Sequence, residues 1–372
     1  MMTNKVTRRT FAKTGIALGA MGLMATPMVH AAENNTIRIG LVGCGGRGRG
    51  AAQNAMTADP NCELVAIGDA FKDKAEGSLE GLKARFGDRV KVKPENIYDG
   101  LECYKGVIEQ CDVVLLCETP KFRPFSLAAA IKAGKHVFCE KPVASDAAGI
   151  KSVMESAKLA KAKGLNLVSG LCWRYDKNVN DIMSRIKDGV IGDIVSVQTN
   201  YLTSRLWTRP KLEGDTEMMA QVRNWYNFAW LSGDFNTEQH VHSLDKASWA
   251  MGDVPPIAAY GLGGRMARTD QPDYGDIYDE MAVVYEYANG KKVFSYCRQQ
   301  NGCFNQTDDF FFGTKGTSNI IGGTPKMCDY NGKVLYEQKK VPSPMYVLEH
   351  EALFGAIRSG GQKYINNGEY MA

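Results

Sequence analysis

The chain has 372 residues, of which 44% are hydrophobic and 23% are charged, an ordinary globular composition that is long enough for two domains. Its formal net charge of +4 comes entirely from the first 31 residues, which contain Lys5, Arg8, Arg9 and Lys13 and no acidic residue. The remaining chain is neutral and has no basic excess for binding nucleic acid. It also lacks an apolar run long enough to span a bilayer. We therefore expect no nucleic-acid partner and no membrane span in the mature protein.

The first 31 residues have the pattern of a twin-arginine signal peptide. Arg8 and Arg9 precede a mildly apolar segment from Gly15 to Ala25, and a Val-His-Ala tripeptide ends at residue 31. We expect this peptide to be removed and the protein to be periplasmic or otherwise exported by twin-arginine translocation. The alternative is a chance Arg-Arg pair ahead of an apolar helix.

The ten cysteines form no Cys-x-x-Cys pair, so neither a zinc ribbon nor a thioredoxin-like site is indicated. Twin-arginine export moves proteins already folded in the reducing cytoplasm, so disulfides are not required. Five cysteines lie in or beside apolar, strand-like runs and are expected to be small buried hydrophobic residues. They are Cys44, Cys62, Cys111, Cys117 and Cys139.

A glycine-rich turn follows the first apolar run of the mature chain. Residues 37–42 lead into Gly43-x-Gly45-x-x-Gly48, and residues 51–56 have a helical pattern. Strand, glycine turn and helix in this order are typical of a dinucleotide fingerprint, with the pyrophosphate at the helix N-terminus. The turn residues expected to contact the cofactor are Gly43, Gly45, Gly46, Arg47 and Gly48. The alternative is a glycine-rich loop without a ligand.

A carboxylate stands where this fingerprint places one for the ribose. A second apolar run, residues 64–67, ends in Gly68-Asp69, and Asp69 lies 21 positions after Gly48. Because a carboxylate here disfavours a 2′-phosphate, NAD is expected before NADP. The nearby Lys72 keeps NADP as the second choice.

Strand and helix patterns alternate through the first part of the chain. Apolar runs at 112–117 and 136–139 are separated by a helical pattern at 125–133, which predicts a doubly wound parallel sheet. The first run leads to Thr119-Pro120 and the second to Glu140-Lys141-Pro142. Both of these segments should lie at the carboxyl edge of the sheet, where such folds bind ligands.

Lys141 is the candidate reactive residue at this edge. The proline after it stops the strand and holds the lysine beside the cofactor crevice. An ammonium group in this place could polarise or protonate a substrate oxygen. Taken alone, a solvated surface lysine is the alternative.

The second part of the chain is predicted to be an α+β domain with a mostly antiparallel sheet. Extended segments at 194–201, 281–287, 291–298 and 309–314 follow one another, and Asn289-Gly290 predicts a hairpin between the second and third. The segment from Tyr201 to Ser232 has no clear periodicity.

That aperiodic segment is rich in Trp, Arg and Tyr, and we expect a long loop over the site. Aromatic faces and arginine forks suit sugars, so Trp207 and Arg223 are candidate substrate contacts. Aromatic packing between domains explains any single one of these residues equally well.

A histidine and carboxylate cluster follows this segment. Glu238 and His242 are four apart, so on a helix they would share a face, and the carboxylate would orient the imidazole as a general base. On a strand, Glu238, His240 and His242 would point the same way and could bind a metal. The helical spacing of apolar residues argues against the metal. A structural histidine pair is the remaining alternative.

These motifs together resemble the Gfo/Idh/MocA family of NAD(P)-dependent oxidoreductases over nearly all of the mature chain. The resemblance implies an N-terminal Rossmann domain, a C-terminal domain with a large open antiparallel sheet, and substrates that are sugars, inositols or their derivatives. It also implies Lys141 as catalytic lysine, His242 as acid/base and a dimer or tetramer. Further cofactor contacts are assigned to Asp69, Thr119, Pro120, Glu140, Lys141 and Arg174, and substrate contacts to Lys141, Tyr175, Trp207, Arg223, His240 and His242.

Some positions depart from the family pattern. The family often has Asp where Glu238 stands and a small residue near His240, and Arg123-Pro124 falls where many members carry histidine. Members also commonly continue beyond a stretch like 367–372, which suggests a truncated sequence.

The expected organisation is a signal peptide (1–31), an NAD-binding Rossmann domain (36–155), an α+β substrate and oligomerisation domain (156–345) and a helical segment returning to the Rossmann domain (346–372). The expected activity is hydride transfer between a sugar or glycoside ring hydroxyl or ketone and a tightly bound NAD, without a metal. Tight binding is expected because an exported enzyme must reoxidise its cofactor in place. Two alternatives are a redox-neutral NAD-dependent glycoside hydrolase and a non-catalytic sugar-binding protein.

Overall fold

The computed structural model describes residues 36–269 and 271–372. The predicted signal peptide at 1–31 lies outside the described residues. Within the described part of the chain, no helix is both long enough and apolar enough to cross a membrane.

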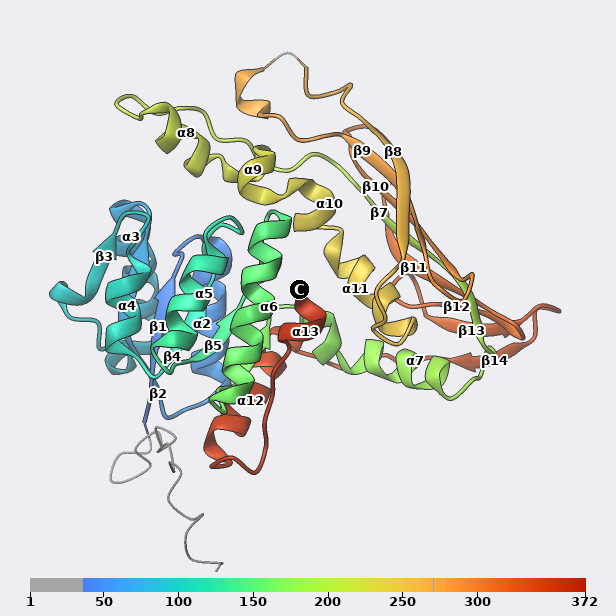
Figure 1. Cartoon of the computed structure of the whole chain (residues 1–372), viewed down its shortest axis with the longest axis horizontal. Helices are drawn as coiled ribbons and strands as arrows, with labels where there is room; N and C mark the ends of the chain where they lie inside the picture. Colours follow the sequence, from blue (N-terminus) through green and yellow to red (C-terminus); the bar gives the residue numbers. More distant parts are fainter. Residues whose placement is uncertain (1–35, 270) are drawn as a thin grey trace, which may run out of the picture. The chain divides into compact units, whose positions relative to one another are not determined.

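A six-stranded sheet, drawn mainly in blue and green in Figure 1, forms the first part of the fold. All neighbouring strands are parallel, in the order β3-β2-β1-β4-β5-β6, which confirms the predicted doubly wound sheet. The strands are β1 (Ile37–Val42), β2 (Cys62–Asp69), β3 (Ile97–Asp99), β4 (Val113–Leu116), β5 (His136–Cys139) and β6 (Leu167–Ser169). Because strand order reverses between β1 and β4, their carboxyl ends open a crevice.

Helices cover both faces of this sheet. Ile39 and Leu41 pack into one buried cluster with α2, α3 and the C-terminal helix α12 (Met345–Arg358), while Val114 and Leu116 pack into a second with α4, α5 and α6. Each fully buried Leu or Ile contributes about 1.5–3 kcal/mol to stability. Because both faces of the sheet are covered, the strands are almost continuously apolar in sequence. The helices are α2 (Gly46–Ala58), α3 (Lys72–Phe86), α4 (Tyr104–Gln110), α5 (Arg123–Lys132) and α6 (Ala147–Ala162), with short 3-10 turns at Gly87–Arg89 and Pro94–Asn96.

The parallel sheet extends past the predicted domain boundary. That boundary, between residues 155 and 156, falls inside α6, and β6 then pairs with β5. Asn366 adds a further parallel bridge to Leu167. The boundary prediction therefore ended the first domain too early, because α6 and β6 complete one more strand–helix–strand unit.

An eight-stranded sheet forms the second part, in the order β14-β13-β12-β11-β7-β10-β9-β8. Only the β10–β7 pairing is parallel, so the predicted mostly antiparallel sheet is confirmed. Gly290, with φ +79°, turns the chain between β9 and β10, as the hairpin signal predicted. The strands are β7 (Ile194–Thr203), β8 (Ala258–Gly264), β9 (Glu280–Glu286), β10 (Lys292–Gln299), β11 (Gln306–Gly313), β12 (Gly316–Asn319), β13 (Lys326–Asp329) and β14 (Val334–Glu337).

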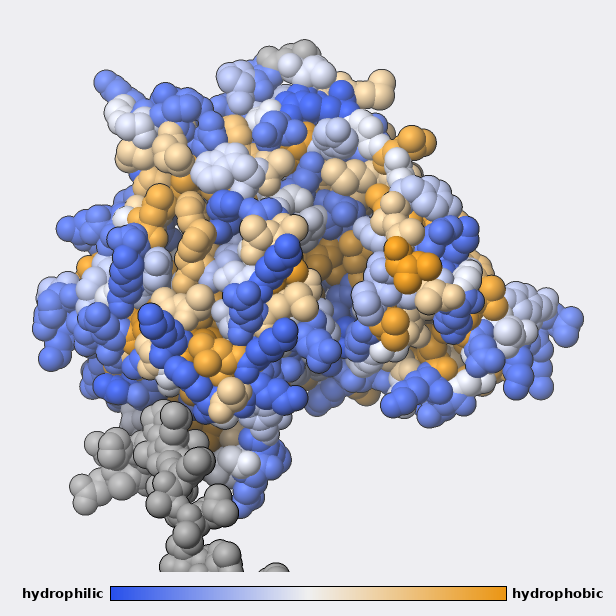
Figure 2. Space-filling view, in the orientation of Figure 1, coloured by the Kyte–Doolittle hydropathy of each residue, from blue (hydrophilic) through white to orange (hydrophobic). Residues whose placement is uncertain are grey.

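Helices α7 (Lys177–Lys187) and α11 (Val241–Ala250) pack on this second sheet. Ile182 and Ile186 of α7 share a buried cluster with Val197, Val293 and Phe311 of the strands. At the sheet edge, β8 is exposed along nearly its whole length. Figure 2 shows hydrophobic residues at the surface over these strands, interspersed with hydrophilic ones.

The aperiodic segment contains short helices as well as loop. We predicted one long loop from Tyr201 to Ser232. Its first residues, up to Thr203, belong instead to β7. Its helices are α8 (Glu217–Arg223) and α9 (Ala229–Ser232), with a 3-10 turn at Trp225–Asn227, and α10 (Asp234–Glu238) follows directly after it. Two further 3-10 turns lie at Cys172–Tyr175 and Pro272–Tyr274. At the end of the chain, α12 (Met345–Arg358) packs on α2, and α13 (Gly368–Met371) packs on α6.

Candidate cofactor and active site

The glycine turn has the geometry of a pyrophosphate cradle. Gly43 has φ +87°, and a Cβ there would collide with the backbone of Glu118. A Cβ on Gly48 would collide with the carbonyl oxygen of Gly43. By contrast, nothing lies within 4 Å of a Cβ built on Gly45 or Gly46, where α2 begins. Two glycines thus permit close packing, and two leave the helix N-terminus open to an anion.

A cavity of about 880 Å³ lies over this turn, within the size range of ligand sites. Its walls come from the carboxyl ends of β1, β2 and β4 and from residues 207–225 of the aperiodic segment. Five basic and three acidic side chains line it, a balance that suits a doubly negative pyrophosphate. They are Arg47, Arg49, Lys74, Arg209 and Arg223, and Asp69, Asp73 and Glu118.

Asp69 occupies the predicted ribose position at the end of β2. Its carboxylate accepts hydrogen bonds from the backbone nitrogens of Cys44 (2.6 Å) and Phe71 (3.0 Å), which fix its orientation toward the cavity. Burial raises the pKa of Asp69, and the two backbone donors oppose this shift. The residues present therefore fit a nicotinamide dinucleotide with its adenosine ribose at β2.

Glu118, after β4, is a cavity residue that the sequence did not single out. It is half-buried, its Oε1 accepts from Ser126, and Oε2 has no partner among the described residues. Burial raises the pKa of Glu118 to about 7. Of the two predicted contacts beside it, Thr119 lines the cavity, whereas Pro120 is buried and does not.

Arg47 links the glycine turn to two buried carboxylates. Its Nε lies 2.5 Å from Glu140 and its Nη2 lies 3.1 Å from Glu349, while its guanidinium stacks 4.6 Å from the ring of Tyr346. Burial and then the charge of Glu140 raise the pKa of Glu349 well above its usual range. Glu349 was not predicted as a site residue, because no local motif in the sequence marks it. The fold brings it to Arg47 from α12, 302 positions further along the chain.

Glu140 also connects this turn to the candidate catalytic lysine. Its Oε2 accepts from the backbone nitrogen of Lys141 at 3.1 Å. Gly170 makes room for it, because a Cβ there would lie 2.7 Å from that same oxygen. The cofactor turn and Lys141 are thus held in register through one carboxylate.

The side chain of Lys141 is paired with Glu238. Its Nζ lies 3.0 Å from Glu238 Oε1 and also donates to the backbone carbonyl of Glu238. Both side chains are mostly buried, with exposed fractions of 15% and 13%. A solvated surface lysine is therefore the wrong description.

His242 lies near this pair but is not held by Glu238. The prediction of a shared helical face was wrong, because α10 ends at Glu238 and α11 begins only at Val241. His242 Nδ1 has no hydrogen-bond partner within the part of the chain that the structure describes. Burial, followed by the charges of Lys141, Lys246 and Arg47, holds the pKa of His242 well below its usual range. The imidazole is therefore neutral at pH 7, not made more basic by a carboxylate.

His240 has a structural position, contrary to its predicted role in substrate binding. Its side chain is fully buried, with Nε2 2.7 Å from Ser295 Oγ and 3.2 Å from Thr199 Oγ1. Burial and then Lys246 lower its pKa to about 3. Among residues 36–269 and 271–372, no three His, Cys, Asp or Glu side chains are arranged to hold a metal.

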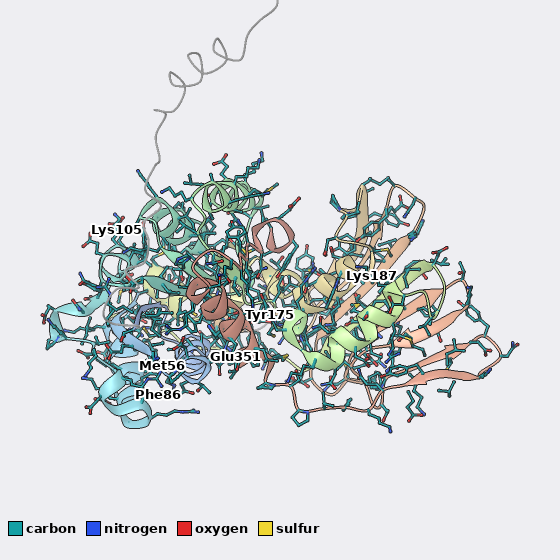
Figure 3. The ribbon with its side chains drawn as sticks, turned by 90° about the horizontal axis from the view of Figure 1, so that it is seen from below. Met56, Phe86, Lys105, Tyr175, Lys187 and Glu351 are labelled. Carbon is teal, nitrogen blue, oxygen red and sulfur yellow. The ribbon has the colours of Figure 1, made fainter. Side chains whose placement is uncertain are left out.

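Arg174 and Tyr175, predicted to contact the cofactor and the substrate respectively, are held by other side chains of the protein, and those roles stay predictions. The guanidinium of Arg174 lies 2.7 Å from Asp245 and 2.5 Å from Asp253, and Tyr370 stacks on it at 4.0 Å. Tyr175 donates to Asn367 at 3.0 Å, and Figure 3 shows it in the centre of the molecule beside the C-terminal helices. Their partners are distant in sequence, so local motifs could not reveal these contacts.

Trp207 and Arg223 line the cavity, but at its adenosine end. Arg223 lies 3.8 Å over the ring of Phe71, two residues after Asp69, and the cavity lining does not extend to Lys141 or His242. Trp207 packs against Trp225 and Tyr226. Both side chains therefore lie beside the residues expected to hold the dinucleotide, and their role as substrate contacts stays a prediction.

The fold and the site define the class of protein: a Rossmann-type oxidoreductase with a second, open-sheet domain. Residues 37–167 match the family model described as "Oxidoreductase family, NAD-binding Rossmann fold", the Gfo/Idh/MocA family. The chain belongs to this family, and its first domain is an NAD(P)-binding domain. The predicted family resemblance is confirmed.

Similar proteins extend the match beyond the first domain. The inositol 2-dehydrogenase of Rhizobium meliloti is 26% identical over 258 residues, covering 69% of this chain and 67% of that protein. The myo-inositol 2-dehydrogenase of Thermotoga maritima is 26% identical over 333 residues, covering 87% and 89%. The aldose-aldose oxidoreductase of Caulobacter crescentus shares the fold, with TM-score 0.69 and 18% identity over 90% of this chain and 93% of that one.

Proposed function

We propose that this oxidoreductase transfers hydride between a ring hydroxyl or ketone of a sugar, glycoside or cyclitol and a tightly bound NAD. The observation that carries the proposal is the connection Arg47–Glu140–Lys141–Glu238, which places an ammonium group at the end of β5 in register with the cofactor turn. The dehydrogenases of inositol among its relatives support a polyol substrate. When bound, a nicotinamide supplies the hydride chemistry.

The chain's own residues handle the proton and the charge. His242, whose Nδ1 has no hydrogen-bond partner among the described residues, accepts the proton of the substrate hydroxyl. Lys141 donates a hydrogen bond to the same oxygen as negative charge develops on it, and Glu238 holds the ammonium group in place. In the opposite direction, the protonated imidazole returns the proton to the new hydroxyl.

The proposed cofactor is NAD rather than NADP. Asp69 has its carboxylate fixed by two backbone donors, so its negative charge cannot turn away from a 2′-phosphate. Lys72, the residue that favours NADP, is 66% exposed and is 3.8 Å from Glu76. The fixed carboxylate of Asp69 favours the free ribose hydroxyls of NAD, while Lys74 and Arg223 are the cations that line the same cavity.

The protein is also proposed to be exported by the twin-arginine route and to form a homo-oligomer. Export of a folded protein would carry the bound nucleotide with it, which favours a cofactor that is regenerated in place. The exposed edge strand β8, with Tyr260 at 55% and Leu262 at 82% exposure, supports self-association through the second sheet.

The test starts from protein purified without added nucleotide. Released nucleotide is identified, and the loaded protein is mixed with a panel of free sugars, inositols and aryl glycosides. Bound NAD that becomes reduced without loss of an aglycone supports the proposal. Aglycone release with no net reduction would identify the redox-neutral glycosidase instead. Protein that contains no nucleotide and binds none would refute the proposal, as expected for a non-catalytic sugar-binding protein.

A further inference from the structure

The wall of the cavity opposite the Rossmann loops comes from the second part of the chain. We name residues 207–225 the roof segment. It contributes eight residues to the lining of the cavity. They are Trp207, Thr208, Arg209, Pro210, Leu212, Val222, Arg223 and Trp225. The turn after β1 and the first turns of α3 also contribute to the lining.

The roof segment is a built structure and not a loose loop. Trp207, Trp225 and Tyr226 pack mutually, with ring centroids 5.7–6.0 Å apart. Asn224 Oδ1 accepts from the backbone nitrogen of Arg209 at 2.9 Å, and Asn227 donates to the backbone carbonyl of Trp207 at 3.1 Å. The two ends of the segment are therefore fastened to each other.

One side chain of the roof segment reaches the adenosine end of the Rossmann domain. The guanidinium of Arg223 stacks 3.8 Å over the ring of Phe71 and lies 3.6 Å from Asp73 at the start of α3. Asp215, which is 5% exposed, holds Arg223 Nε at 3.2 Å and so fixes its direction. An arginine is preorganised for stacking and ion pairing at the same time.

A second attachment lies just beyond the roof segment. The backbone nitrogen of Lys121 donates to the carbonyl of Leu231 at 3.2 Å, and Ser145 Oγ donates to the carbonyl of Trp230 at 3.0 Å. These bonds tie the chain that follows the roof segment to the loops after β4 and β5. The Arg223–Phe71 contact is a separate attachment, and it lies within the cavity lining.

We propose that the roof segment retains the dinucleotide and that Arg223, stacked on Phe71, is its positioning residue. The ligand class is an adenine dinucleotide, whose pyrophosphate lies on Gly45 and Gly46 beneath a wall that adds two of the five cavity cations. Dissociation then requires the Arg223–Phe71 contact to open. This inference rests on the proposed function, in which NAD is tightly bound. It attributes slow release of the cofactor to the contact between Arg223 and Phe71.

The test measures NADH release directly, by trapping with excess NAD and following nicotinamide fluorescence in the full chain. Arg223→Ala is expected to speed release about tenfold, from the loss of one stacked cation contact, and to lower the nucleotide that survives gel filtration. Arg223→Lys, which keeps the charge but not the flat stack, should be intermediate.

Lys211→Ala is the matched control, since Lys211 is an exposed cation of the same segment that is paired with Glu217 and does not line the cavity. Its release rate should equal that of the wild type. Phe71→Leu removes the ring on which Arg223 stacks and should also speed NADH release. It tests the same contact if the Arg223→Ala variant is unstable. If both Arg223→Ala and Phe71→Leu released NADH at the wild-type rate, the inference about the roof segment would be wrong, while the proposed function would be unaffected. A wild-type protein that binds no NADH would instead refute the proposed function.

Discussion

Lys141 Nζ lies 3.0 Å from Glu238 Oε1, and this pair joins the carboxyl end of β5 to the end of α10. The same ammonium group donates to the carbonyl of Glu238, so its position is fixed by two oxygens of one residue. The lysine is thus ordered before any substrate arrives. Preorganised charge of this kind stabilises a transition state without reorganisation at the moment of reaction.

Replacing Lys141 should separate catalysis from cofactor binding. Lys141→Met is expected to lower kcat by roughly 10²- to 10⁴-fold, because the group that stabilises the developing charge is lost. NADH affinity, measured by fluorescence titration, should change little, since the cavity lining does not include Lys141. Lys121→Met, on the neighbouring loop and paired with Asp146, is the control and should keep full kcat. Equal losses in both variants would contradict the assignment.

Glu238→Gln tests whether the partner of the lysine matters by its charge. The amide preserves the shape and one acceptor, but it cannot balance the ammonium group. We expect kcat to fall about tenfold, since a charge-assisted hydrogen bond contributes about 1.5–3 kcal/mol. Steady-state kinetics over a range of pH would measure this. An unchanged kcat would mean that Glu238 only fills space beside Lys141.

Asp69 should determine both the affinity for NAD and the discrimination against NADP. Asp69→Ala removes the carboxylate that would accept the ribose hydroxyls, so the Kd for NADH should rise by about 10- to 100-fold. The Kd for NADPH should change less, because a repulsive charge is removed together with the acceptor. Glu76→Ala, which removes an exposed carboxylate of the following helix α3, is the control. A wild-type protein that binds NADPH more tightly than NADH would contradict the proposal.

The first domain could be predicted because its signals are local. Gly43, Gly45 and Gly48 lie within six positions, and the neighbouring strands read as uninterrupted apolar runs. The hairpin at Asn289-Gly290 is equally local, since the turn needs only the positive φ that Gly290 adopts. Such features depend on backbone geometry within a few residues, which the sequence records directly.

The site was harder to predict because its partners meet only in three dimensions. Glu349 lies 302 positions from Arg47, and Asp253 lies 79 positions from Arg174. The spacing of Glu238 and His242 was misleading, since it assumed a continuous helix where the chain breaks between α10 and α11. Arg223 was predicted as a substrate contact, and no periodicity could show that it lies over Phe71 in the cavity.

A buried ion pair beneath His242 should be critical for stability. Lys246 lies 3.0 Å from Asp309, with both side chains at most 1% exposed, and it donates to the carbonyl of His242 at 2.8 Å. Lys246→Met leaves an unpaired buried carboxyl and should cost about 3–5 kcal/mol in urea unfolding. Adding Asp309→Leu should recover most of that loss, because no charge is then left buried. A double variant no more stable than Lys246→Met would contradict this account.

His350 should make the free energy of unfolding depend on pH in a way that one substitution removes. It is fully buried, its ring lies 4.2 Å from that of Phe138, and neither ring nitrogen has a hydrogen-bond partner among the described residues. Burial and then the charge of Arg47 lower its pKa to about 3. Below pH ~6.5 the unfolded chain therefore binds a proton at His350 that the folded chain does not bind. The contribution of this histidine to the free energy of unfolding, which is fully present above that pH, is lost as the pH falls toward 3.

His350→Phe should abolish this contribution while keeping the aromatic packing. Any constant cost of the slightly larger ring cancels when the two proteins are compared at two pH values, and so do the other titrating groups. Relative to the wild type, the variant should gain about 1.4 kcal/mol between pH ~7.5 and pH ~5.5, since each pH unit below the unfolded pKa contributes that amount. Urea unfolding at both pH values measures the difference. A difference that does not change with pH would mean that His350 is protonated in the folded protein, which would require a partner for its ring in that state.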